Sequence, residues 1–310
     1  MEIIVHRAGM LTTIQDLGRR GHRAAGVPLS GAMDRFALRV GNLLVGNEQD
    51  AAGIETTLAG PELEFTADAI VAVTGATFAG VPSWQPFQVR AHERLRLGNP
   101  VTGCRGYLLV AGGIQVPLAL GSRSTYLRAG LGGHEGRALR EGDRLPAGES
   151  PRRLAAHWHI DERILPRYST AATVRVVRGP QADEFGGRLA KSEFRLLPQS
   201  DRMGVRLGGS RLLRIGRADE LVSAAVAPGT VQVPPDGLPI VLMADAQTIG
   251  GYPQAANVIG VDLPIIAQAR PGDRLRFEEI PLTEAQQLFL ARERVLGMLH
   301  QGLKDKVLPE

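Results

Sequence analysis

The segment IETTLAGPELEFTADA, residues 54–69, aligns without a gap with VQVPPDGLPIVLMADA, residues 231–246. Apolar residues coincide along the alignment, and both segments end in Ala-Asp-Ala. Further along, ERLRL at 93–97 matches DRLRF at 273–277 at nearly the same offset. Small changes of offset are typical of loop insertions. The repeat therefore indicates two related domains, as a duplication would produce.

Short strand-like runs dominate the rest of the chain. Examples are EIIV at 2–5, AIVAV at 69–73, GYLLVA at 106–111 and TVRVV at 173–177. They are rich in β-branched residues and bounded by Gly, Pro, Asp or Asn, which is typical of strands. This pattern favours sheets or barrels over alternating βαβ units. We therefore predict a mainly β protein.

Two helices interrupt this pattern. The first is predicted over residues 31–45, with Ser30 as its N-cap. The second is predicted over residues 284–300, where Thr283 and Gln286 fit a capping box. The predicted domains are residues 1–170 with an insert, residues 171–282, and a C-terminal helix and tail at 283–310.

Composition excludes several classes of protein. The chain has 310 residues and one cysteine, so it forms no internal disulfide. It lacks a secretory signal and any apolar run near the ~18 residues of a membrane helix, so we expect a cytoplasmic protein without membrane association. The net charge of +4 is scattered, which argues against nucleic-acid binding. His157 and His159 lack further ligands nearby, so no metal site is predicted.

Three polar stretches remain, at residues 11–34, 197–209 and 243–260. Each mixes acids, arginines or amides with glycine, which is what orienting a small polar substrate requires. For any single residue, a local turn contact is an equally good interpretation. The GSRST segment at 121–125 fits either an anion site or a tight turn.

These stretches resemble a known family. The motifs TTIQDLGRRGHRAAGVPLSGAMD, GNLLVGN, SDRMGVRL, VQVPPDGLPIVLMADAQTIGGYP and AQARPGDRLRF are similar to those of the KipA / 5-oxoprolinase C-subunit family. That family is also called allophanate hydrolase subunit 2 or the carboxyltransferase C/D domain. The resemblance implies two cyclophilin-like β-barrel domains with a few helices. It covers about residues 3–285.

The resemblance also implies an activity and partners. Similar proteins act with an A subunit and a KipI-like B subunit as an ATP-dependent 5-oxoprolinase, an amide hydrolase that opens 5-oxo-L-proline to L-glutamate. ATP is expected at the assembled complex, because no phosphate-loop sequence is present in this chain. Two alternatives stay open. One is carboxyl transfer from carboxybiotin in a urea carboxylase-like system, which alone would require biotin. The other is a regulatory protein that binds a KipI-like kinase inhibitor.

Under the 5-oxoprolinase interpretation, arginines would hold a phosphate or the substrate carboxylate. Aspartates would orient a proton or a water molecule, and amide and hydroxyl groups would bind the lactam. The residues assigned to catalysis are Asp16, Arg19, Asp34, Asp201, Arg202, Arg206 and Asp245, and those assigned to substrate binding are Gln15, Ser30, Ser122, Arg123, Gln232, Gln247, Thr248 and Tyr252.

Overall fold

The computed structural model describes residues 1–149, 152–154, 160–216, 221–303 and 307–309. The chain forms two compact units, of which the first comprises Met1–Arg19, Ser30–Pro166 and Arg294–Glu310, and the second Arg20–Leu29 and Arg167–Glu293. This grouping differs from the contiguous domains expected from the sequence. The segment Arg20–Leu29 joins the second unit because it packs there, and the Arg23 guanidinium donates a hydrogen bond to the Val226 carbonyl.

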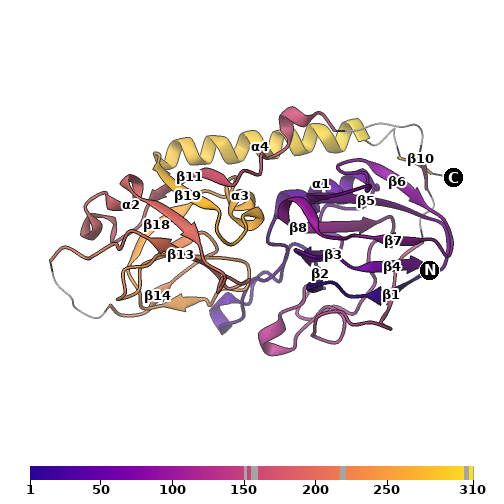
Figure 1. The fold of residues 1–310 in the computed structure, drawn as a ribbon, viewed down its shortest axis with the longest axis horizontal. Helices are drawn as coiled ribbons and strands as arrows, with labels where there is room; N and C mark the ends of the chain where they lie inside the picture. Colours follow the sequence, from indigo (N-terminus) through magenta and orange to yellow (C-terminus); the bar gives the residue numbers. More distant parts are fainter. Residues whose placement is uncertain (150–151, 155–159, 217–220, 304–306, 310) are drawn as a thin grey trace. The chain divides into compact units, whose positions relative to one another are not determined.

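The first unit is built from two antiparallel sheets (Figure 1). The four-stranded sheet has the order β7 (Arg94–Arg96), β4 (Glu62–Phe65), β1 (Glu2–Arg7) and β9 (Arg144–Pro146). The five-stranded sheet has the order β2 (Leu11–Gln15), β3 (Gly53–Thr57), β8 (Pro100–Val110), β5 (Ala69–Phe78) and β6 (Pro86–Val89). The short strands β10 (Arg152–Leu154) and β20 (Val307–Pro309) pair separately.

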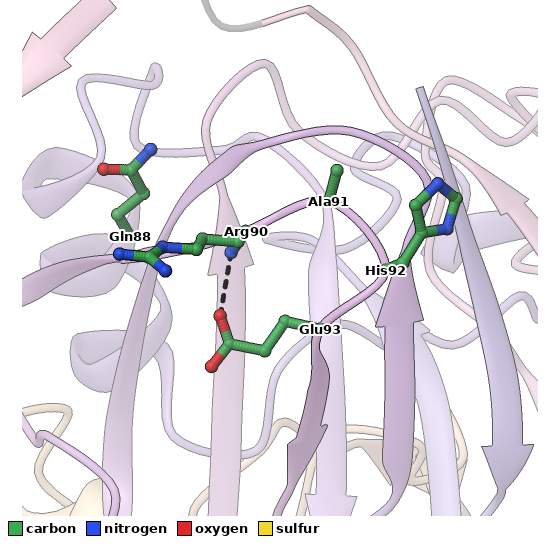
Figure 2. Close-up of a pocket in the computed structure, with 5 residues that line it drawn as sticks. All are labelled: Gln88, Arg90, Ala91, His92 and Glu93. Atoms are coloured by element: carbon green, nitrogen blue, oxygen red, sulfur yellow. Dashed lines mark hydrogen bonds between the residues drawn. The ribbon is translucent and has the colours of Figure 1, made fainter.

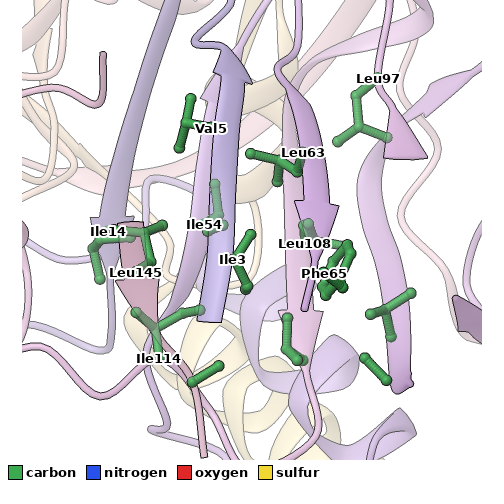
Figure 3. Packing of buried hydrophobic residues seen from close by; sticks show 14 of the residues in the cluster. Ile3, Val5, Ile14, Ile54, Leu63, Phe65, Leu97, Leu108, Ile114 and Leu145 are labelled. Carbon is green, nitrogen blue, oxygen red and sulfur yellow. The ribbon is translucent and has the colours of Figure 1, made fainter. Parts of the chain in front are cut away.

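One hydrophobic core joins these two sheets (Figure 3). Ile3 and Phe65 come from the four-stranded sheet, while Ile54 and Leu108 come from the five-stranded one, and all four are at most 1% exposed. Burying an aliphatic or aromatic side chain of this size contributes roughly 1.5–3 kcal/mol. The alternation of strand residues therefore places the apolar face of each sheet inward.

The opposite face of the five-stranded sheet carries a buried polar row. Cross-strand pairing aligns Thr13 with Glu55, Glu55 with Tyr107, and Tyr107 with Thr74. Helix α1 (Arg35–Leu44) covers this face, and the Thr74 hydroxyl donates to the Ala37 carbonyl at 2.7 Å. The helix thus shields polar side chains that would otherwise face solvent.

The start of α1 differs from the prediction. Its N-cap is Asp34, whose Oδ1 accepts the Ala37 N–H at 2.9 Å, so the predicted Ser30 cap is wrong. Ser30 has φ +56° and Gly31 has φ +87°, a left-handed conformation that an α-helix excludes. The helix therefore begins at Arg35 instead of residue 31.

The second unit contains a closed barrel. Its strand order is β11 (Ala171–Arg178), β18 (Gln254–Val258), β15 (Thr230–Gln232), β16 (Ile240–Leu242), β13 (Gly204–Gly209), β12 (Glu193–Leu196) and β19 (Arg274–Glu279), which returns to β11. Strands β14 (Ala224–Ala225) and β17 (Ile249–Gly250) pair outside it. Helices α2 (Arg188–Lys191) and α3 (Leu263–Gln268) also belong to this unit. The prediction of a mainly β fold is confirmed. Of the two β-barrels expected, the second unit forms a closed one, whereas the strands of the first unit pair as separate sheets.

The last helix, α4, runs from Leu282 to Leu303. It begins before Thr283, which therefore lies in the first turn, and the predicted capping box is wrong. The Ala285 N–H instead donates to the Pro281 carbonyl at 3.1 Å. Within the described residues, no helix combines the length and hydrophobicity needed to cross a bilayer.

Candidate functional site

The Asp16 carboxylate is the centre of a buried cluster in the first unit. Oδ1 accepts the Gly18 N–H and the Ser122 hydroxyl, each at 2.7 Å, as well as the Ser124 hydroxyl. Oδ2 accepts the Arg123 N–H at 2.6 Å. Asp16, Ser122 and Arg123, which the sequence analysis placed in one site, are therefore in contact. The donors of the 121–125 turn point to the protein's own carboxylate, so Asp16 orders this turn.

Arg19 lies beside the same turn and is fully buried. Its Nη2 donates to the Ser124 carbonyl. Gly132 closes over it with φ +68°, and a Cβ atom there would lie 2.8 Å from Arg19 Nη2 and 2.2 Å from the Ser124 oxygen. Protein atoms thus enclose the guanidinium.

Gln15 and Ser30 flank Asp16 and retain hydrogen-bonding capacity. Gln15 Nε2 donates to Thr13 Oγ1 at 3.0 Å and to the Thr125 carbonyl at 3.2 Å. Gln15 Oε1 and Ser30 Oγ are buried, and neither has a hydrogen-bond partner among the residues that the structure describes. Such an atom costs about 1–3 kcal/mol unless water or a ligand satisfies it. A hydrogen bond to either atom would recover this cost.

The polar row of the five-stranded sheet adds two groups that sequence reasoning missed, Glu55 and Tyr107. The Tyr107 hydroxyl donates to Glu55 Oε2 at 2.8 Å and accepts the Asp34 N–H at 2.7 Å, while the Met33 N–H donates to the same Glu55 oxygen at 2.9 Å. Burial, followed by the charges of Glu55 and Asp34, raises the pKa of Tyr107 well above its usual value. The phenol therefore remains a donor.

A signal for Glu55 was present in the sequence. It aligns with Gln232 in the internal repeat, and an acid in the middle of an otherwise uncharged strand requires a buried partner. Both side chains are 2% exposed. The repeat thus places a buried polar group at the corresponding position of each unit.

In the second unit, Arg202 and Asp245 form a buried bidentate ion pair. Nε to Oδ2 measures 2.8 Å and Nη2 to Oδ1 3.1 Å, with each side chain 5% exposed. Asp201 has a different role, because its Oδ1 accepts the N–H groups of Met203 and Gly204 at 2.8 and 3.1 Å. Asp201 therefore makes local turn contacts, which is the alternative to a catalytic role.

The predicted amide cluster of this unit also comes together. Gln247 Nε2 donates to Gln232 Oε1, and Gln232 Nε2 donates to the Tyr252 carbonyl, both at 3.3 Å. A Cβ atom on Gly250 would lie 2.6 Å from Gln232 Nε2, so a larger residue there would displace the end of the Gln232 side chain. Thr248 is 8% exposed, and its carbonyl accepts the Val226 N–H at 3.1 Å. Tyr252 takes part through its main chain.

A surface cavity of about 660 Å³ lies in the first unit (Figure 2). Gln88 and Arg90 line one side of it and His92 the other, with none of the predicted site residues present. His92 Nδ1 lies 3.2 Å from Glu64 Oε1, and His6 Nε2 lies 2.7 Å from Glu64 Oε2. These bonds, that of His6 first, lower the pKa of Glu64.

Metal ligands are not clustered in the described part of the chain, which contains no group of three or more suitable His, Cys, Asp or Glu side chains. His157 and His159 lie outside the described residues.

With these contacts established, comparison with known proteins identifies the family. Residues 25–279 match the carboxyltransferase domain, subdomain A and B. The chain belongs to this family. The matching subdomains are A and B, in place of the C/D label that the motifs suggested. The resemblance found in the sequence is otherwise confirmed.

Individual relatives extend this match over nearly the whole chain. The C subunit of 5-oxoprolinase from Escherichia coli is 42% identical, over 97% of this chain and 98% of that protein. The Haemophilus influenzae protein of the same name is 40% identical, over 95% and 96%. The crystal structure of Kluyveromyces lactis urea carboxylase superposes with a TM-score of 0.89 at 29% identity, covering 100% of this chain but 30% of that protein.

Proposed function

We propose that this chain is the C subunit of an ATP-dependent 5-oxoprolinase. Together with an A subunit and a KipI-like B subunit, it hydrolyses the lactam of 5-oxo-L-proline to L-glutamate. The observation that carries the proposal is the 42% identity to the C subunit of a 5-oxoprolinase over 97% of this chain and 98% of that protein. Because the alignment covers nearly all of both proteins, the similarity does not rest on one shared motif.

Substrate recognition is assigned to neutral groups of the first unit. A lactam presents one N–H donor and one carbonyl acceptor. Gln15 Oε1 is a buried acceptor and Ser30 Oγ a buried hydroxyl, so the pair complements both groups. Asp16 acts indirectly in this proposal, because it holds Ser122 and Arg123 in place.

The nucleotide is assigned to the assembled complex. Phosphate cradles are built from main-chain N–H groups that point to the anion. In the 121–125 turn, the Arg123 N–H points instead to Asp16 Oδ2 at 2.6 Å. The described residues of this turn therefore do not fit a phosphate, and no contact with ATP is assigned to them.

Carboxyl transfer is the second candidate function. It is favoured by the TM-score of 0.89 to a urea carboxylase and by the paired amides of Gln232 and Gln247, which match the hydrogen-bonding groups of a biotin ureido ring. The relative that carries this activity in its name is much longer than the chain, which spans 30% of it. We therefore rank carboxyl transfer below lactam hydrolysis.

The deciding experiment measures ATP-dependent formation of glutamate from 5-oxo-L-proline. The chain is assayed alone and with the A and B subunits, and those two partners are also assayed without it. Activity only in the complete mixture is expected. A stable assembly of all three proteins that forms no glutamate would refute the assignment, and transfer from carboxybiotin would then be assayed with the same preparation.

A further inference from the structure

A second cavity, of about 460 Å³, opens on the barrel of the second unit. Cavities of roughly 300–1,000 Å³ are typical of small-molecule sites. Two charged side chains, Arg206 and Asp236, line it together with the Gln199 amide and the apolar residues Leu238 and Ile240. Neither the predicted lactam groups Gln15 and Ser30 nor the Arg202–Asp245 pair lines this cavity.

Strand register builds the floor of the cavity. Arg206 in β13 is the direct cross-strand partner of Ile240 in β16, so their side chains lie on the same face. Val205 and Val241, on the opposite face, are at most 2% exposed and point into the barrel. Arg206 therefore projects outward beside an apolar neighbour and is accessible to a ligand.

The rim is fixed by a tight turn. Asp236 Oδ1 accepts the Leu238 N–H at 2.9 Å, and the Gly237 N–H donates to the Pro234 carbonyl at 2.9 Å. Gly237 has φ +77°, and its carbonyl accepts the Leu212 N–H at 2.8 Å. The Asp236 carboxylate is thus held in position before any ligand arrives, which reduces the entropy lost on binding.

We propose that this cavity binds a small carboxylate that also carries an amide or amine N–H. Arg206 binds the carboxylate, as guanidinium groups do in bidentate fashion. Asp236 and the Gln199 carbonyl accept the N–H, and Leu238 and Ile240 pack against methylene groups. The class follows from the lining residues, whereas the choice of 5-oxoproline or glutamate as its member rests on the proposed function.

The test is a calorimetric titration of the full-length chain, without its partner proteins, with 5-oxo-L-proline and with L-glutamate. 2-Pyrrolidinone, the same lactam without its carboxylate, is the ligand control. Arg206→Gln is expected to weaken binding of the carboxylates by about tenfold or more, because a charged hydrogen bond is lost. Lys191→Gln removes one exposed positive charge outside the cavity in the same unit and should leave binding unchanged.

Absence of binding to the wild-type chain would overturn the inference. So would equal binding by the wild type and Arg206→Gln, or equal binding of 2-pyrrolidinone and 5-oxo-L-proline. A second measurement separates this result from the function. The titration is repeated with the assembled complex, whose turnover is assayed in parallel. Turnover without Arg206-dependent binding of the carboxylates would remove the inference and leave the 5-oxoprolinase intact, whereas Arg206-dependent binding in a complex without turnover would remove only the function.

Discussion

The buried pair Arg202–Asp245 allows a structural role to be separated from a catalytic one. Arg202→Met removes the guanidinium from a carboxylate whose side chain is 5% exposed. Removing one partner of a buried ion pair costs about 3–5 kcal/mol, because the remaining charge stays desolvated. Replacing both partners, as in Arg202→Met with Asp245→Leu, is often close to neutral. We therefore expect most of the lost stability to return in the double variant.

The assay must report on the second unit. Both tryptophans of the chain, Trp84 and Trp158, precede residue 167, where the main segment of that unit begins, so tryptophan fluorescence would follow the first unit. Urea unfolding by far-UV circular dichroism is therefore combined with hydrogen exchange at the Asp245 amide, which donates to the Arg202 carbonyl at 2.9 Å.

Two results would refute this reasoning. One is a loss below about 1 kcal/mol in Arg202→Met, which is the range of an exposed pair. The other is a double variant as unstable as the single one. Turnover in the assembled complex then shows whether the Arg202–Asp245 pair is structural or catalytic. A folded double variant that retains activity makes the pair structural, and a folded but inactive one supports the catalytic role expected from the sequence.

Three further variants test the first unit. Asp16→Asn should destabilise the first unit by about 3 kcal/mol, because the NH2 group of the new amide would face hydrogen-bond donors that now point to the carboxylate. An unchanged melting temperature would contradict this. Ser30→Gly should stabilise the first unit by about 1 kcal/mol, because the φ of +56° at this position costs glycine little. The same variant should lower turnover if the Ser30 hydroxyl binds substrate, and unchanged activity would exclude that contact. Hydrogen bonding to Arg137 lowers the pKa of Asp143 from 3.8 to about 2. The depressed pKa stabilises the fold above about pH 4 by about 2 kcal/mol, which is lost as the pH falls to about 2. The difference in urea stability between the wild type and Asp143→Asn should therefore shrink over that range, and a difference independent of pH would refute this.

The internal repeat indicated where strands form, but it did not indicate which strands pair with each other. Its two copies fold as β3 with β4 and as β15 with β16. β15 and β16 pair directly, whereas β3 and β4 belong to different sheets. Alternating apolar residues determine which side of a strand is buried, but pairing depends on segments far away in the chain. The Ser30 cap was wrong for a related reason, since the backbone that packs on Asp16 sets its left-handed conformation.

Prediction of the site was also limited by contacts between residues far apart in the chain. Residue type and motif membership brought Asp16 with Ser122 and Gln232 with Gln247 into single clusters, and the structure shows these contacts. Tyr107 was not predicted as a site residue because it lies in an apolar run. Its hydroxyl gains a role only through the hydrogen bond to Glu55 on the neighbouring strand. Contacts across a sheet are not visible in local sequence patterns.

The aspartates show how the chain divides its polar groups. Asp16, Asp34, Asp201 and Asp245 all accept hydrogen bonds from the protein itself, to a turn, a helix end or an arginine. A carboxylate committed in this way is a poor proton carrier, because moving its proton would break the structure that it holds. What remains for a ligand are neutral groups and, in the cavity of the second unit, the exposed Arg206 with the Asp236 carboxylate. Under the proposed function, this division suits a protein that binds and orients its substrate, and the catalytic groups for turnover are expected from the partner proteins.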